Sequence, residues 1–210
     1  MLAGAFYVAT HQLGCSVNRA VENPAFPLTF ADAKADLDRM RDDPKPLDRP
    51  GVVLAGYRAW PMLAQGVRYK LFSVTSGEPK DFLPISYTFQ GDIEKIAGMA
   101  TRRIEERWPS DSPDETFEVD IVGISMGGLV ARTASLPLGD LSDGNETRTK
   151  RQKLGTLYTI GSPHRGAIRT GGTKIMGHFS ITTDDRIMAD LARRLRGEEP
   201  HGSPSPAPEN

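Results

Sequence analysis

The order of apolar and helical stretches in this chain of 210 residues predicts an α/β fold with a doubly wound, mostly parallel sheet. The continuous apolar run over residues 51–56 is typical of a strand buried on both faces, and residues 154–160 form another strand. Between them lie a helical stretch over 93–108 and a strand, turn and helix over 117–134. This alternation of strands and helices is typical of parallel strands joined by crossover helices.

The first fifty residues are expected to form an N-terminal extension. Residues 1–10 are apolar and lead to Cys15, the only cysteine, and small residues before a lone cysteine resemble the end of a bacterial lipoprotein signal. Against that interpretation, there is no basic start, and His11-Gln12 interrupts a short apolar run. The alternative is a loosely packed segment in which Cys15 is a small buried hydrophobic residue. Membrane anchoring through Cys15 in the cell envelope and a cytoplasmic location both stay open.

The second half of this extension is expected to hold a helix and a stiff connector. Thr29 and Asp32 have the spacing of a capping box, and apolar residues repeat at helical spacing as far as Asp43-Pro44. Three closely spaced prolines then deliver the chain into the main domain, which we expect to span residues 51–197.

The first part of the main domain is expected to alternate between strand and helix. Residues 61–90 are expected to contain a short helix and one or two strands, of which 82–89 is the clearer. Asp92 is expected to cap a helix whose apolar residues recur at helical spacing until Pro109 stops it.

The second part of the domain begins with a polar segment, residues 137–153, which we interpret as an exposed loop with ordinary surface charges. After the strand over 154–160, a last helix is expected to be capped by Asp184 and ended by Gly197. The residues that follow, 198–210, are rich in Pro, Ser and Glu and are expected to form a disordered tail.

The segment Gly123-Ile124-Ser125-Met126-Gly127 fits the G-x-S-x-G pattern of a nucleophile elbow. A serine on a sharp strand-to-helix turn exposes its hydroxyl above the sheet, and the flanking glycines let strand and helix approach without Cβ clashes. Alternating β-prone residues precede Ser125 and a helical run follows it, which is the context that the pattern requires. The alternative is a serine that only fills a Gly-rich turn. We therefore expect Ser125 to be a nucleophile.

Four segments together resemble lipase- and esterase-type α/β-hydrolases over roughly residues 51–197. They are the GISMGG turn, the strand ending in LAGY, the YTIGSPHRGA segment and the late GHFSITTDDRIMADLARRL segment. LAGY departs from the family pattern, which more often has His-Gly at that point. The resemblance implies an α/β-hydrolase-like sheet and a serine hydrolase that acts on small-molecule or lipid esters with no cofactor and no metal.

The resemblance also implies a general base on the last strand-to-helix turn, and the matching position is His178. One alternative is that His178 lies in a Gly-rich loop and has no catalytic role; His164, in the SPHRG segment, and His201, in the tail, are the other candidates for the base. In the family the histidine of the SPHRG segment follows an inner strand and is not the base. The implied mechanism has Ser125 attack the ester carbonyl while His178 accepts its proton.

The backbone N–H groups of Met126 and Tyr57 are the expected oxyanion hole. Met126 directly follows the nucleophile, and Tyr57 lies in the loop after the 51–56 run. In a doubly wound sheet such a loop faces the carboxyl edge of the strands, where ligands bind.

The acid that would orient the base has no clear position. The family order is Ser, then Asp or Glu, then His. The acidic residues between Ser125 and His178 all lie in the polar loop: Asp140, Asp143 and Glu146. Only 11 residues separate Gly166 from His178, so the chain is expected to be shortened here relative to the family. The base would then be unsupported or held by an unusual partner such as Asp184 or a backbone carbonyl, and we expect weak esterase activity.

Charge and composition narrow the expected partners. A net charge of -1 gives no reason to expect nucleic acid or an anionic membrane surface as a partner, and no apolar run is long enough to span a bilayer. Two other functions stay open: a non-catalytic binding or envelope protein with this fold, which a missing acid would favour, and an acyltransferase that uses the same serine with an alcohol acceptor. The sequence does not determine the acyl length, the leaving group or the oligomeric state.

Overall fold

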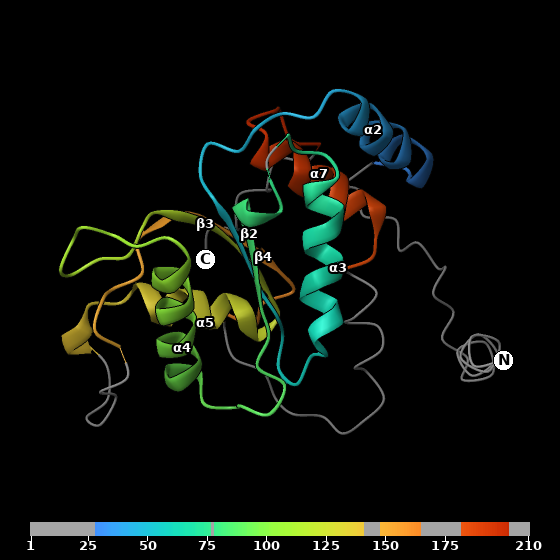
Figure 1. Ribbon diagram of the computed structural model, residues 1–210. Coiled ribbons are helices and arrows are strands. Elements are labelled where there is room, and N and C mark those ends of the chain that lie inside the picture. The colour runs from blue at the N-terminus through green and yellow to red at the C-terminus, as the bar shows by residue number, and fades with distance from the viewer. Residues whose placement is uncertain (1–27, 77, 141–147, 165–181, 202–210) are drawn as a thin grey trace, which may run out of the picture.

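The computed structural model describes residues 28–76, 78–140, 148–164 and 182–201. They form a four-stranded, all-parallel sheet with helices on both faces (Figure 1), which confirms the predicted α/β class. The strands lie in the order β2-β1-β3-β4. Their bounds are β1 (Gly51–Leu54), β2 (Phe82–Ile85), β3 (Val119–Ile124) and β4 (Leu154–Ile160).

The helices that cover the sheet begin where the sequence predicts. The α-helices are α2 (Phe30–Asp42), α3 (Pro61–Phe72), α4 (Ile93–Arg107), α5 (Met126–Ser135) and α7 (Asp185–Leu195), with short 3₁₀ turns η1 (Pro79–Asp81) and η2 (Leu138–Asp140). Thr29, Asp92 and Asp184 each accept a hydrogen bond from a backbone N–H two or three residues further on, which confirms the predicted caps. Within the described ranges, no helix combines the length and apolar composition needed to cross a membrane.

The strand expected over residues 82–89 is shorter, because its second half bends toward the loop after β1. The buried Tyr87 hydroxyl donates to Ala55 O, and Thr88 Oγ1 donates to Ala59 O at 3.0 Å. These side chains bind the neighbouring loop and do not continue the strand.

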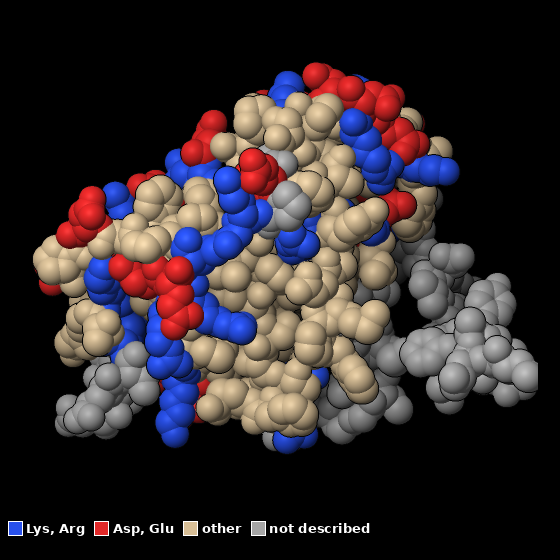
Figure 2. Space-filling view, in the orientation of Figure 1, with Lys and Arg blue, Asp and Glu red and all other residues tan. Residues whose placement is uncertain are grey.

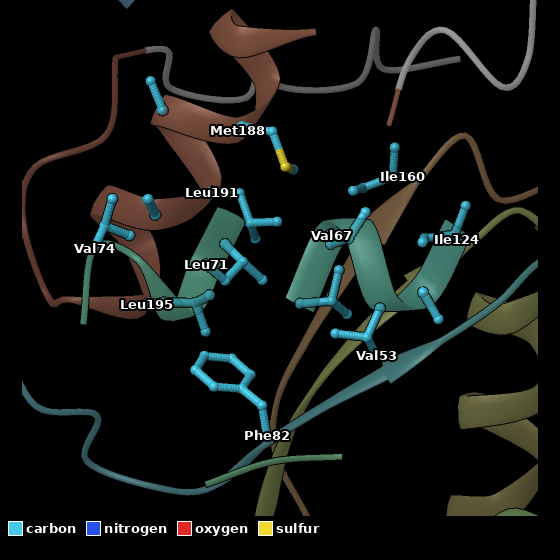
Figure 3. Packing of buried hydrophobic residues seen from close by; sticks show 14 of the residues in the cluster. Val53, Val67, Leu71, Val74, Phe82, Ile124, Ile160, Met188, Leu191 and Leu195 are labelled. Atoms are coloured by element: carbon cyan, nitrogen blue, oxygen red, sulfur yellow. The ribbon is translucent and has the colours of Figure 1, made fainter. Parts of the chain in front are cut away.

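Successive residues of β1 pack into opposite layers. Val53 lies in a core under α2, α3 and α7, where Leu71 and Leu191 also pack (Figure 3). Val52 and Leu54 lie in a second core under α4 and α5. The helix that follows β1 and the helix that follows β3 therefore cover opposite faces of the sheet.

The helix expected in the N-terminal extension is part of this same domain. Ala33, Leu37 and Met40 are buried in the core that α7 also lines. At the start of the two helices, the Arg186 guanidinium lies 4.1 Å from the centre of the Phe30 ring. At the other end, Arg196 donates to Met40 O, so α2 and α7 run side by side in the same direction.

Arg196 joins the carboxyl ends of three helices. Its side chain is buried, and it donates to Met40 O at 3.0 Å, to Asp43 O at 2.8 Å and to Val74 O at 2.5 Å. Its Nε donates to Glu198 at 2.9 Å. The guanidinium thus satisfies carbonyls that helix ends leave without an intrahelical partner.

A second charged cluster surrounds Asp36 of α2. Arg193 donates to both of its carboxylate oxygens, at 2.6 and 3.0 Å, and His201 Nε2 lies 2.7 Å from Oδ2. Burial alone would raise the pKa of Asp36, but the hydrogen bonds from Arg193, His201 and Arg39 outweigh it and hold that pKa well below its ordinary value. Glu198 and His201, expected to lie in a disordered tail, therefore contact α2; residues 202–210 lie outside the described part of the chain.

The polar segment over 137–153 was expected to be an exposed loop, and this is wrong for Arg148 and Gln152, which are buried. Arg148 donates to the backbone carbonyls at the end of α5 and just beyond it: Thr133 at 2.6 Å, Ala134 at 2.5 Å, Leu136 at 2.5 Å and Pro137 at 3.2 Å. Five N–H donors on a planar fork suit a cluster of carbonyls. Burial lowers the pKa of Arg148, and the neighbouring Arg151 lowers it further.

Candidate active site

The sheet has a switch point between β1 and β3. The strands are hydrogen-bonded neighbours, yet α3 leaves β1 toward one face and α5 leaves β3 toward the other (Figure 1). Where connections diverge in this way, a crevice opens outside the carboxyl ends of the strands, and ligands bind there in open α/β sheets. Ser125 directly follows β3, and Gly56 and Tyr57 lie in the loop after β1.

Ser125 has the backbone of a strained turn. Its φ of 53° and ψ of -120° lie outside the backbone regions that residues other than glycine usually adopt. Its N–H donates to Ile160 O at 2.8 Å, and its carbonyl accepts from the Gly128 N–H at 3.2 Å. Such strain costs on the order of 1–3 kcal/mol and persists only where the surroundings impose it.

Three glycines let α5 pack closely against the strands. A Cβ on Gly123 would lie 2.6 Å from Gly128 Cα, and one on Gly127 would lie 2.8 Å from Ala55 O and closer still to Leu54 O. The close approach predicted from the glycine spacing is therefore present. Gly128 adds a contact that the pattern did not predict, because its Cβ would lie 2.8 Å from the Ser162 Cβ.

The loop after β1 passes beside the serine. A Cβ on Gly56 would lie 3.2 Å from Ser125 Cβ and 3.7 Å from its Oγ. The Gly56 carbonyl accepts from the Ala59 N–H at 3.2 Å, which closes a turn. Tyr57 and Arg58 at the tip of this turn are exposed, and Arg58 has a left-handed φ of 51°. The backbone at Gly56 thus borders the Ser125 hydroxyl, and Tyr57 is the next residue.

Tyr87 and Thr88 hold this loop, and neither was predicted from the sequence as a site residue. Tyr87 is 4% exposed, and its hydroxyl donates to the carbonyl of Ala55, the residue before Gly56. Burial raises the pKa of Tyr87, so the hydroxyl stays a donor across the physiological range. No signal in the sequence indicated this role, because Tyr87 lay within the strand expected over 82–89.

The general base expected at His178 lies outside the described residues, as does Cys15. His164 is exposed in the turn after β4, where Arg132 Nη1 lies 3.3 Å from its Nδ1. An arginine only donates, so Nδ1 can accept a hydrogen bond here only in the tautomer that carries its proton on Nε2. His201 is bound to Asp36 on α2.

Asp184, the suggested partner for the base, is already engaged. Its Oδ1 accepts from the Arg186 N–H at 2.9 Å and from Arg186 Nε at 3.1 Å, and its Oδ2 accepts from Arg186 Nη2 at 2.7 Å. Burial would raise the pKa of Asp184, but these hydrogen bonds lower it. Of the acids in the polar segment, Asp143 and Glu146 lie outside the described residues, and the Asp140 side chain is not described either.

Two cavities bounded by described residues lie away from the serine. One of about 490 Å³ is lined by α4 and by Arg148, Thr149 and Lys150, and one of about 470 Å³ is lined by Ser112, Pro137 and their neighbours. The strained turn at the switch point is the stronger indication of a site, because it combines backbone strain with a reactive side chain. Among the described side chains, no group of three or more His, Cys, Asp or Glu residues could hold a metal ion.

Comparisons of the chain with protein-family models, with curated proteins and with solved structures found no match.

Proposed function

We propose that this protein is a serine hydrolase of carboxylic esters in which Ser125 is the nucleophile. The observation that carries the proposal is the strained backbone of Ser125 between β3 and α5, at the switch point of a parallel sheet. The amino end of α5 begins at the next residue, so its N–H groups and dipole favour negative charge beside Ser125 Oγ. These are the requirements for an acyl transfer that develops an oxyanion.

In the proposed mechanism, Ser125 Oγ attacks the carbonyl carbon while His178 accepts its proton. The N–H groups of Met126 and Tyr57 stabilise the oxyanion, and the close approach of Gly56 to Ser125 supports the role of this loop. His178 then protonates the departing alcohol, and the acyl group stays on Ser125. Water attacks the acyl-enzyme in the same way and releases the acid.

The proposed activity is weak, because the base has no evident acid. Asp184 is committed to Arg186 and to the cap of α7, so it is a poor partner for an imidazole. Loss of the orienting carboxylate alone lowers turnover by about 10⁴-fold in a serine protease. We therefore expect kcat/KM on short-chain p-nitrophenyl esters to fall below about 10⁴ M⁻¹s⁻¹, the low end of the usual enzyme range.

A fluorophosphonate probe tests the nucleophile, because only an activated serine reacts with it. Ser125→Ala should abolish labelling and leave the folded state intact. Ser135→Ala is the matched control, since Ser135 lies at the other end of α5 and its Oγ donates to Arg132 O at 2.8 Å. Equal labelling of the Ser125→Ala variant and the parent would disprove the assignment.

The base is tested by two histidine variants. Esterase activity should drop by orders of magnitude in His178→Ala and much less in His164→Ala. The opposite result would move the role of base to His164.

A folded parent that neither labels nor hydrolyses any ester would favour the alternative of a non-catalytic binding protein. The engagement of Asp184 with Arg186 is the observation that favours this alternative. Ester products formed with added alcohol would instead identify an acyltransferase.

A further inference from the structure

A second strained residue, Arg58, lies in the loop that passes beside the proposed nucleophile. Among the described non-glycine residues, only Ser125 and Arg58 have a positive φ, 53° and 51°. Both follow strands at the same edge of the sheet. Glycine would adopt this conformation at Arg58 without the steric conflict that an L side chain meets there. A strained residue that is not glycine is a reason to look for what its side chain does.

The contacts of Arg58 within the protein do not account for its presence. Its side chain is exposed, and its guanidinium lies 5.3 Å from the centre of the Tyr57 ring. A cation over an exposed ring contributes no more than the left-handed backbone costs. None of the described acidic side chains forms an ion pair with Arg58, whereas elsewhere Lys150 pairs with Glu105 at 2.6 Å and Lys70 with Asp185 at 2.8 Å.

The described residues at this edge of the sheet supply no carboxylate partner for Arg58. On the face shown in Figure 2, basic and acidic side chains lie interspersed. In the turn after β4, His164 Nδ1 lies 3.3 Å from Arg132 Nη1, and Arg132 forms no ion pair with a described carboxylate either. The acid in the loop after β2, Asp92, is bound to the Glu94 and Lys95 N–H groups as the cap of α4.

We propose that Arg58 binds a negatively charged group of the substrate, so that the site acts on esters that carry a carboxylate or phosphate near the scissile bond. The inference rests on the proposed function. Tyr57, whose N–H is the proposed oxyanion donor, immediately precedes Arg58, so an anionic group held by Arg58 lies close to the reacting carbonyl. The planar guanidinium suits two-point binding of either oxyanion.

Matched pairs of esters test this inference. The p-nitrophenyl monoester of adipic acid and p-nitrophenyl hexanoate share a six-carbon acyl chain and differ in a terminal carboxylate. On the alcohol side, 4-acetoxybenzoate and 4-acetoxybenzamide differ in the same way. At low salt, we expect the kcat/KM of the parent to be about tenfold higher for the anionic member of one pair than for its neutral partner. This is the effect of one charge-assisted hydrogen bond at a partly screened site. The pair that shows the preference locates the charge on the acyl or the alcohol side.

Variants of Arg58 test whether this side chain causes the preference for anionic esters. Arg58→Gly removes the charge and the backbone strain together, so it should unfold at no lower temperature than the parent and lose the preference. Arg58→Lys should retain part of it, and Arg41→Gln, on α2 beside Asp38, should retain all of it.

The outcomes separate this inference from the proposed function. Labelling of Ser125 together with equal rates on both members of each pair, or a preference that survives in Arg58→Gly, overturns the role of Arg58 and leaves the hydrolase intact. A folded parent that neither labels nor hydrolyses any of the four esters overturns both.

Discussion

Replacing Arg148 with methionine should lower the free energy of unfolding by about 3 kcal/mol, the scale of one or two charged hydrogen bonds. The guanidinium donates to four carbonyls at and just beyond the end of α5. Methionine keeps most of the aliphatic volume of the side chain and removes every donor. The change therefore tests the cap and not the packing.

The expected loss of unfolding free energy is smaller than the number of hydrogen bonds from Arg148 suggests. Two nitrogens, Nη1 and Nη2, share the four carbonyls, and a hydrogen bond to a charged group contributes about 1.5–3 kcal/mol, so two such groups give about 3–6 kcal/mol. Burial of the guanidinium, which lowers the pKa of Arg148, offsets part of this gain.

Urea unfolding followed by circular dichroism measures the effect. With a slope of about 2–3 kcal/mol/M, the midpoint should fall by about 1–1.5 M. Arg151→Met is the control in the same segment, since its exposed pair with Glu115 should contribute less than about 1 kcal/mol. Arg148→Lys should lie between, because one ammonium cannot reach all four carbonyls. An Arg148→Met midpoint equal to that of Arg151→Met would refute the reasoning.

Three further predictions concern the elbow and the acidic cluster. Gly127→Ala should destabilise the fold by about 2–3 kcal/mol in thermal unfolding, because the added Cβ meets Leu54 O, and a loss below about 1 kcal/mol would contradict the close packing. Ser125→Gly should be more stable than Ser125→Ala by about 1 kcal/mol, since glycine relieves the strained backbone; equal stability would argue against strain. Hydrogen bonds hold the pKa of Asp36 well below 3.8 and, against the effect of burial, lower that of Glu198 from 4.5 to about 2. Both carboxylates should therefore stabilise the fold fully above about pH 5 and progressively less as the pH falls toward 2, and a urea midpoint that stays constant from pH 6 to pH 3 would contradict this.

The elements that the sequence predicted well are those with local signals. Helix caps at Thr29, Asp92 and Asp184 are contacts between residues two or three apart, so the sequence around each one determines it. The strand over 154–160 has the predicted bounds. The turn at Ser125 was predictable for a similar reason, because the glycines that permit it lie within three residues.

Contacts with distant backbone atoms could not be predicted. Arg148 and Tyr87 both bind main-chain carbonyls, and every residue has one, so composition does not indicate the partner. The strain at Arg58 had no signal either, because the usual sign of a left-handed position is glycine. The cap at Asp184 was predicted; the added hydrogen bonds from the Arg186 side chain are also local but were not predicted.

The pairing of α2 with α7 affects how the chain folds while it is being synthesised. About 140 residues separate the two helices in the sequence, and a ribosome adds them in roughly 7–30 s at about 5–20 residues per second. During that time Leu37 and Met40 have no α7 to pack against. A nascent chain therefore carries an uncovered apolar helix face until nearly the whole domain has emerged, and chains that stop short of Asp185 keep that face as a target for chaperones and proteases.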